Sequence, residues 1–186
     1  MTVAEMERRL LERLEAATEN PTQAMWELAQ FYKQDNRLDR ASEVFNDLLG
    51  RVVDLEIKAQ IIFSLGQTAE KSNDFELAVR FYREALAMEP CDSFTWYYIH
   101  NNLGLALAGQ GCHREAAESF IAATQANAAD PRSLRHLESL LTEHPELEFD
   151  FADARDACRK AVAVAKEAIE QADTRWTAAA RRKQSA

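Results

Sequence analysis

The sequence predicts an all-α protein, an α-α superhelix of stacked antiparallel helix pairs with a capping helix at each end. The first observation is one pattern of apolar and small residues that occurs three times with the same internal offsets. The second is composition: only 5 Gly and 4 Pro are present among 186 residues, and alternating β-branched runs are absent. Apolar residues make up 47%, enough for a continuous core. A pattern repeated at this period indicates helix pairs that bury their apolar faces only against their neighbours.

The repeated pattern spans two helices in each copy. Within the first helix, a Leu and the small residue after it lie four and three positions before the next apolar residue, so they share one face. Small residues are expected where helix backbones come close, and the bulky aromatic residue of the second helix fills the space beside them. In chain order the copies read Leu28-Ala29, Tyr32, Ala41, Phe45 and Leu48; Leu65-Gly66, Ala69, Ala78, Tyr82 and Ala85; and Leu103-Gly104, Leu107, Ala116, Phe120 and Ala123.

These copies resemble the tetratricopeptide repeat (TPR) over roughly residues 22–128, and residues 97–104 are especially similar to bacterial members of the family. Met25, Ile62 and His100 replace the family's frequent tryptophan. The central alanines at 41, 78 and 116 are 37 and 38 residues apart, against about 34 in the standard repeat. We expect the extra residues to add a turn to the first helix of the second and third units.

The segments outside the three units are also expected to be helical, within a single domain. Residues 1–20 form an N-terminal capping helix, because Thr2 and Glu5 make a capping box. Residues 21–148 hold the three units and a degenerate fourth helix, with Asp130 as its cap and Pro131 at its first position. Residues 149–186 form a long C-terminal helix and tail.

The C-terminal helix carries an apolar stripe whose spacing by threes and fours is typical of coiled coils. Two interpretations follow. The helix either shields the end of the array, or forms a homodimer contact through its far half. The stripe consists of Phe151, Ala154, Cys158, Val162, Ala165, Ile169, Ala172 and Trp176.

Charge and composition exclude several classes of function. With 22 basic and 31 acidic residues the net charge is −9, which disfavours nucleic-acid binding. No apolar run suits a signal peptide or a membrane span, so we expect a cytoplasmic protein without membrane contact. The cysteines and histidines lack metal-ligand or catalytic spacing, and Gly109-Gln110-Gly111 is a turn between helices. We therefore expect no enzyme, catalytic residue, metal or cofactor.

The resemblance implies a non-catalytic protein-interaction module, an adaptor or scaffold that binds a peptide or helix in its concave groove. In the family the first helix of each unit lines that groove. Aromatic rings would hold the partner's side chains, and amides would bond its backbone. The competing interpretation is that Trp26, Phe63 and Tyr98 pack against the added turns or terminal helices. The predicted groove residues are Trp26, Gln30, Phe63, Gln67, Tyr98, Asn101, Asn102 and Leu105, with Gln23, Lys33, Gln60 and Glu70 beside them.

Three narrower functions are alternatives to this one. Members that hold acidic chaperone tails use Lys, Arg and Asn at positions that match Trp26, Gln30, Ser64, Tyr98 and Asn102 here. No cation is present at any of these positions, so that function is not expected. Small acidic chains of this layout also resemble the chaperones of type III secretion translocators, although the longer repeats and the long final helix differ. The third alternative is an oligomerisation element that acts through the final helix.

Overall fold

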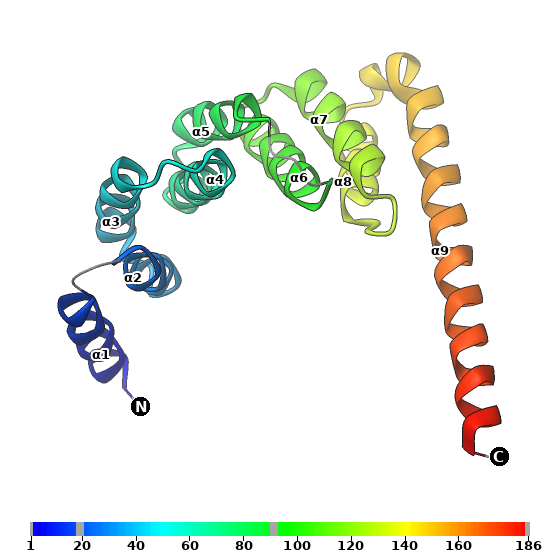
Figure 1. The fold of residues 1–186 in the computed structure, drawn as a ribbon. Helices are drawn as coiled ribbons and strands as arrows, with labels where there is room; N and C mark the ends of the chain where they lie inside the picture. The colour runs from blue at the N-terminus through cyan, green and yellow to red at the C-terminus, as the bar shows by residue number, and fades with distance from the viewer. Residues whose placement is uncertain (1, 18–20, 90–92, 185–186) are drawn as a thin grey trace.

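The computed structural model describes residues 2–17, 21–89 and 93–184, and every regular element in these ranges is helical. The helices stack in chain order along an arch, and the last one extends away from its far end (Figure 1). The fold is therefore the all-α stack of helix pairs that the repeats predict. Its elements are α1 (Val3–Ala16), α2 (Thr22–Gln34), α3 (Leu38–Arg51), α4 (Leu55–Lys71), α5 (Phe75–Ala87), α6 (Ser93–Gly109), α7 (His113–Ala126), α8 (Arg132–Glu143), the 3-10 turn η1 (Pro145–Leu147) and α9 (Glu148–Gln184).

The turn inside each helix pair repeats with the same period as the side chains. Asn36, Asn73 and Gly111 each have a positive φ, of 60°, 59° and 79°. Asn and Gly are the residues that adopt this left-handed conformation most readily. Asp74 then starts α5 by accepting a hydrogen bond from the Leu77 amide at 3.1 Å. The three pairs thus share one backbone turn.

The predicted pairing of small and aromatic residues forms the core. A Cβ atom placed on Gly66 would lie 2.5 Å from a ring carbon of Tyr82, and one on Gly104 would lie 2.5 Å from a ring carbon of Phe120. Both aromatic side chains are buried. The glycines are therefore required for close approach to a ring, and the first unit places Ala29 at this position.

The first helices differ in length as expected. Both α4 and α6 contain 17 residues, against 13 in α2, so the added turn is confirmed. At the amino end the capping box is also confirmed, with Thr2 Oγ1 accepting from the Glu5 amide and the Glu5 carboxylate accepting from the Thr2 amide. Leu10 of α1 packs into the core with Met25 and Leu28 of α2.

Helix α8 begins one residue later than predicted. Pro131 is its N-cap, and the first helical residue is Arg132. Asp130 still satisfies the helix terminus, because its Oδ1 atom accepts from the Arg132 amide at 3.0 Å. The prediction was wrong because the Asp130 side chain caps from one position further out than a standard N-cap.

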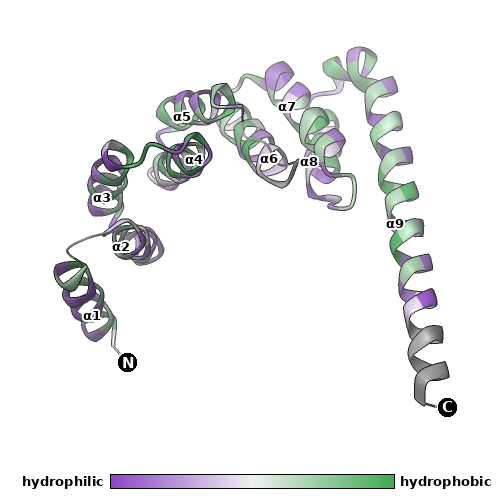
Figure 2. Ribbon diagram, viewed as in Figure 1, coloured by the Kyte–Doolittle hydropathy of each residue, from purple (hydrophilic) through white to green (hydrophobic). Residues whose placement is uncertain are grey.

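Helix α9 divides into a packed half and an open half. Phe151 joins the core beside Leu137 and Leu140 of α8, and Cys158 is also buried. Further along, Ile169 is 49% exposed and Trp176 is 75% exposed. Figure 2 shows apolar residues recurring along α9 well past the helices that pack against it. No helix in the described ranges is long and apolar enough to span a lipid bilayer.

Candidate functional site

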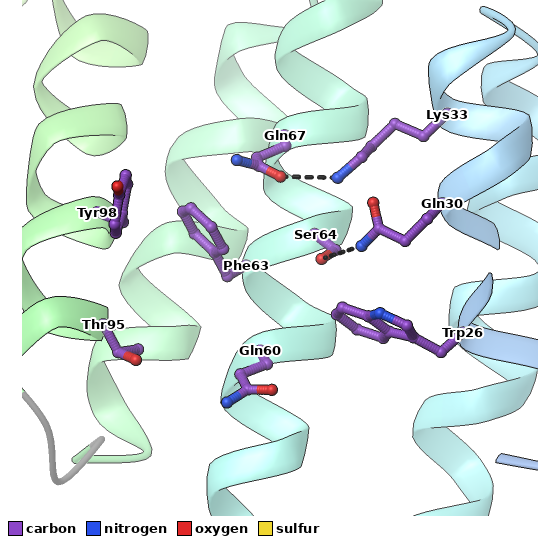
Figure 3. A pocket seen from close by; sticks show the side chains of 9 residues that line it. All are labelled: Trp26, Gln30, Lys33, Gln60, Phe63, Ser64, Gln67, Thr95 and Tyr98. Carbon is purple, nitrogen blue, oxygen red and sulfur yellow. Dashed lines mark hydrogen bonds between the residues drawn. The ribbon is translucent and has the colours of Figure 1, made fainter. Parts of the chain in front are cut away.

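A cavity of about 320 Å³ opens between α2, α4 and α6. These helices lie on the inner side of the arch, and α3, α5 and α7 lie on its outer side (Figure 1). We call this cavity the groove. It contains five of the eight predicted site residues. Its lining consists of Trp26, Gln30, Lys33, Gln60, Phe63, Ser64, Gln67, Thr95 and Tyr98 (Figure 3).

Helical spacing brings these side chains to one surface. On α2, Trp26, Gln30 and Lys33 follow one another at four and three residues, which places them on a single face. On α4, Gln60 and Gln67 flank Phe63 in the same way. The opposite faces carry the Leu-Ala and Leu-Gly pairs that pack against neighbouring helices, so the repeat pattern itself turns the polar and aromatic face inward.

Each aromatic ring of the groove rests on another ring. The Trp26 and Phe45 rings meet edge to face with centroids 5.7 Å apart, and the Phe63 and Tyr82 centroids are also 5.7 Å apart. Trp26 in addition borders a second hollow against α1. Phe45 and Tyr82 are fully buried, so they hold the rings of Trp26 and Phe63 in place. Trp26 and Phe63 themselves remain half-buried. The rings therefore form a preorganised apolar surface.

Two polar bridges cross from α2 to α4 beside the rings. Lys33 Nζ donates to Gln67 Oε1 at 2.8 Å, and Gln30 Nε2 donates to Ser64 Oγ at 3.4 Å (Figure 3). The second bond is long and therefore weak. An incoming backbone group can replace it at small cost, so the amide of Gln30 is available to a partner.

Lys33 is the electrostatically unusual residue of the groove. It is only 9% exposed, and burial together with the nearby Lys71 lowers its pKa to about 8. Lys71 Nζ donates to the Lys33 carbonyl oxygen at 3.1 Å. The neighbouring Glu70 instead accepts from the Tyr82 hydroxyl at 2.7 Å, and burial raises the pKa of this carboxyl. In the described ranges, neither lysine forms an ion pair with a carboxylate.

Three predicted residues lie outside the groove lining. Asn102 borders an adjoining hollow of about 340 Å³ together with Lys33, Gln67, Glu70 and Lys71. Leu105 is half-buried against the core. Asn101 is 6% exposed, and its Oδ1 atom accepts from Ser133 Oγ at 2.8 Å. It also lies 3.1 Å from His136 Nδ1, so Asn101 connects α6 to α8 rather than facing a partner.

Thr95 was missed by the sequence reasoning. It lies three residues before Tyr98, one turn earlier on the same face of α6, so helical spacing could have found it. No group of three or more His, Cys, Asp or Glu side chains in the described part of the chain is arranged to hold a metal ion. The groove therefore presents rings, amides and one buried ammonium group.

Comparisons with known proteins agree with this architecture. The family model of the tetratricopeptide repeat matches residues 59–90, which include most of the second unit. The MamA structure from Desulfovibrio magneticus RS-1, residues 41 to the end, superposes with a TM-score of 0.60 at 16% identity, covering 91% of this chain and 94% of that one. BtubC from P. vanneervenii superposes with a TM-score of 0.67 at 15% identity, covering 89% and 72%. The chain therefore contains a tetratricopeptide repeat within a stack of TPR-like helix pairs.

Curated relatives of this TPR chain share part of its sequence. The photosystem I assembly protein Ycf3 of Acaryochloris marina is 32% identical over 89 residues, which cover 46% of this chain and 53% of that protein. Its counterpart in Synechococcus elongatus is 26% identical over 108 residues, covering 56% and 62%. The TPR chain thus spans between half and two thirds of the relatives that it matches, and its likeness to the solved structures is one of fold.

Proposed function

We propose that this protein is a non-catalytic interaction module that binds an extended peptide or a helix of another protein in the groove. The observation that carries the proposal is the row of three half-buried rings, Trp26, Phe63 and Tyr98, one from each unit. Rings held in place by a buried core bind apolar side chains with little loss of conformational entropy. The name of the curated relatives, photosystem I assembly protein, supports a function in holding other polypeptides.

The polar groups of the groove support the same function. Gln60 lies beside the rings, and Gln30 forms only a weak bond across them, so both can exchange hydrogen bonds with a partner's backbone. This combination of rings for side chains and amides for the main chain is how peptide-binding surfaces obtain affinity and register. The lining residues of the groove include no histidine, cysteine or carboxylate, which are common acid–base and nucleophilic groups of enzymes.

A displayed library of random 12-residue peptides, selected on the intact chain, tests this proposal. Synthetic copies of the selected peptides should bind at least tenfold more weakly, by about 1.4 kcal/mol, to the Phe63→Ala, Tyr98→Ala double variant. Helical circular dichroism should remain unchanged. Phe149→Ala is the matched control, because the Phe149 side chain is 95% exposed on α9.

Variants on the outer face of the arch show which result would contradict groove binding. Charge reversal at Glu76 or Arg83, on the outer helix α5, should leave binding unaltered. If these reversals weaken binding as much as the double variant does, the partner binds the outer face of the arch. A selection that yields no peptide contradicts the proposal altogether.

A second candidate function is self-association through α9. The observation that favours it is the exposure of Ile169 and Trp176 on the stripe that is buried at Phe151 and Cys158. Exposed apolar residues at coiled-coil spacing are typical of helix-pairing surfaces. Sedimentation velocity of the intact chain decides: a dimer that the Ile169→Asp, Trp176→Asp variant converts to a monomer supports this function, and a wild-type monomer contradicts it.

A further inference from the structure

The two lysines at one end of the groove form no ion pair with a carboxylate in the described part of the protein. Lys33 Nζ bonds to an amide oxygen of Gln67, and Lys71 Nζ bonds to the peptide oxygen of Lys33. Both acceptors are neutral. The Phe45 ring lies 5.8 Å from the Lys33 ammonium group and adds only a weak cation–π attraction. A buried ammonium group without an anion is unusual in folded proteins.

Glu70 is the acidic residue that borders the adjoining hollow together with both lysines, and it forms no ion pair with either lysine. Its carboxyl group bonds to the buried Tyr82 hydroxyl instead. Lys71 is itself a cation, and its proximity makes the charge on Lys33 less favourable. The protein therefore keeps two ammonium groups together on an otherwise acidic chain of net charge −9. Such an arrangement lowers stability unless a ligand compensates it.

We propose that Lys33 and Lys71 form a subsite that binds a carboxylate. The carboxylate is the side chain of an Asp or Glu residue of the protein partner, and the apolar residues next to that Asp or Glu contact the rings of Trp26 and Phe63. This inference rests on the proposed function of the groove and specifies its partner. Lys33 lines both the groove and the adjoining hollow, so a carboxylate between them can reach both lysines. The amides of Gln67 and Asn102 border the same space and can donate to its oxygens.

The arrangement in Figure 3 sets the order of the partner's groups. Lys33 and Gln67 lie at one end of the groove, Gln60 and Thr95 lie toward the other, and the rings of Trp26 and Phe63 lie between them. The acidic residue therefore lies at one end of the bound segment, next to its apolar anchors. Lys33 and Lys71 are not at the positions that match the chaperone-tail members of the family; of the residues that border the subsite, Asn102 alone is at such a position.

Binding measurements on peptides selected with the intact chain test the subsite. Selected peptides should contain Asp or Glu beside an apolar residue. Replacing that acid by its amide, or making the protein variant Lys33→Met, should each weaken binding at least tenfold, and the two losses together should not add, because both remove one interaction. Lys160→Met is the matched control: it removes the same charge from an exposed position on α9 and should leave the dissociation constant unchanged.

The outcomes separate this inference from the function on which it rests. Peptides that depend on Phe63 but not on Lys33 or Lys71 overturn the subsite and leave groove binding intact. Peptides that depend on neither overturn both. If the essential carboxylate is the peptide's free C-terminus, amidation of the chain end will abolish binding while Glu→Gln will not, and the assignment to an acidic side chain is then wrong.

A pH titration provides a second, independent readout. Burial and Lys71 lower the pKa of Lys33 to about 8, and a bound carboxylate favours the charged form. Affinity for the acidic peptide should therefore fall by at least fivefold between pH 7 and pH 9.5, while affinity of its amide analogue stays constant. Parallel pH profiles for the two peptides would contradict the subsite.

The stability of the free protein must show the opposite trend. The pKa of Lys33 is lower in the folded chain than in the unfolded one, about 8 against roughly 10.4, so the unfolded state binds more protons between these values. Wild type should therefore gain stability relative to Lys33→Met as pH rises from 8 to 10, as measured by urea unfolding. A constant difference across this range would mean that Lys33 is not a desolvated cation.

Discussion

The array α2–α7 and the helix α9 carry the same kind of apolar pattern with opposite outcomes. In the array, residues such as Ala78 and Phe120 are buried because each helix lies between neighbours. On α9 the stripe is buried at Phe151 and Cys158, yet Ile169 and Trp176 on the same stripe are open to solvent. Spacing by threes and fours therefore specifies a helix and its apolar face, but only neighbouring elements cover that face.

Length explains the difference. Helix α9 has 37 residues and is therefore about 55 Å long, whereas α8 has 12 and measures about 18 Å. Beyond the region of Cys158, α9 has outrun the helices that could cover it. The protein thus has two exposed surfaces of different form, a concave groove preorganised by its core and a projecting apolar stripe, and we propose each as a partner surface.

The largest expected difference in stability between the array α2–α7 and helix α9 comes from substitutions that enlarge a side chain in each. Ala78→Leu should destabilise the protein on the order of 1–3 kcal/mol or more, because Ala78 is fully buried between helices. Ala163→Leu makes the same change on the open part of α9, where the side chain is exposed. It should alter stability by less than about 0.5 kcal/mol. Chemical unfolding measures both, and equal effects would show that the array is not close-packed at Ala78.

A smaller contrast comes from glycines inside and outside the core contacts. Gly66→Ala should cost about 1 kcal/mol, because the new methyl group would meet the buried Tyr82 ring. Gly50→Ala has open space around its new Cβ atom, and it should stabilise helix α3 by roughly 0.5 kcal/mol. Opposite signs in thermal unfolding are the expected result. A stabilising Gly66→Ala would show that the ring can move away.

The smallest effect is expected at the end of α9. Truncation after Ala172 removes the exposed Trp176, and it should change the free energy of unfolding of the monomer by less than about 0.5 kcal/mol. Circular dichroism melting at low protein concentration measures this. A clear loss of monomer stability would mean that the whole of α9 serves as a cap, and a loss only at high concentration would identify the removed part as a dimer contact.

Local rules predicted most of the architecture and part of the site. The turn residues, the small–aromatic pairs and the longer α4 and α6 all follow from interactions within one repeat. Five groove residues followed from helical offsets together with the family resemblance, which implies that the first helix of each unit lines the groove. Asn101 did not, because helix α8 covers it and takes its side chain into hydrogen bonds with Ser133 and His136. The sequence offset places Asn101 on the correct helix, but it contains no information on which neighbour lies opposite.

The sequence by itself determined which segments are helical, where their turns fall and which side chains contact one another inside a repeat, since those interactions link residues close together along the chain. The tertiary structure decided which faces are covered, how far α9 projects and how Lys33 and Lys71 come together without forming an ion pair with a carboxylate. Those lysines are 38 residues apart, one more than the 37 residues between matching positions of the first two units, so they are not equivalent positions of the repeat. Only the stacking of α2 on α4 converts that spacing into a shared, partly desolvated space, and desolvation is a property of the assembled helices rather than of any one of them.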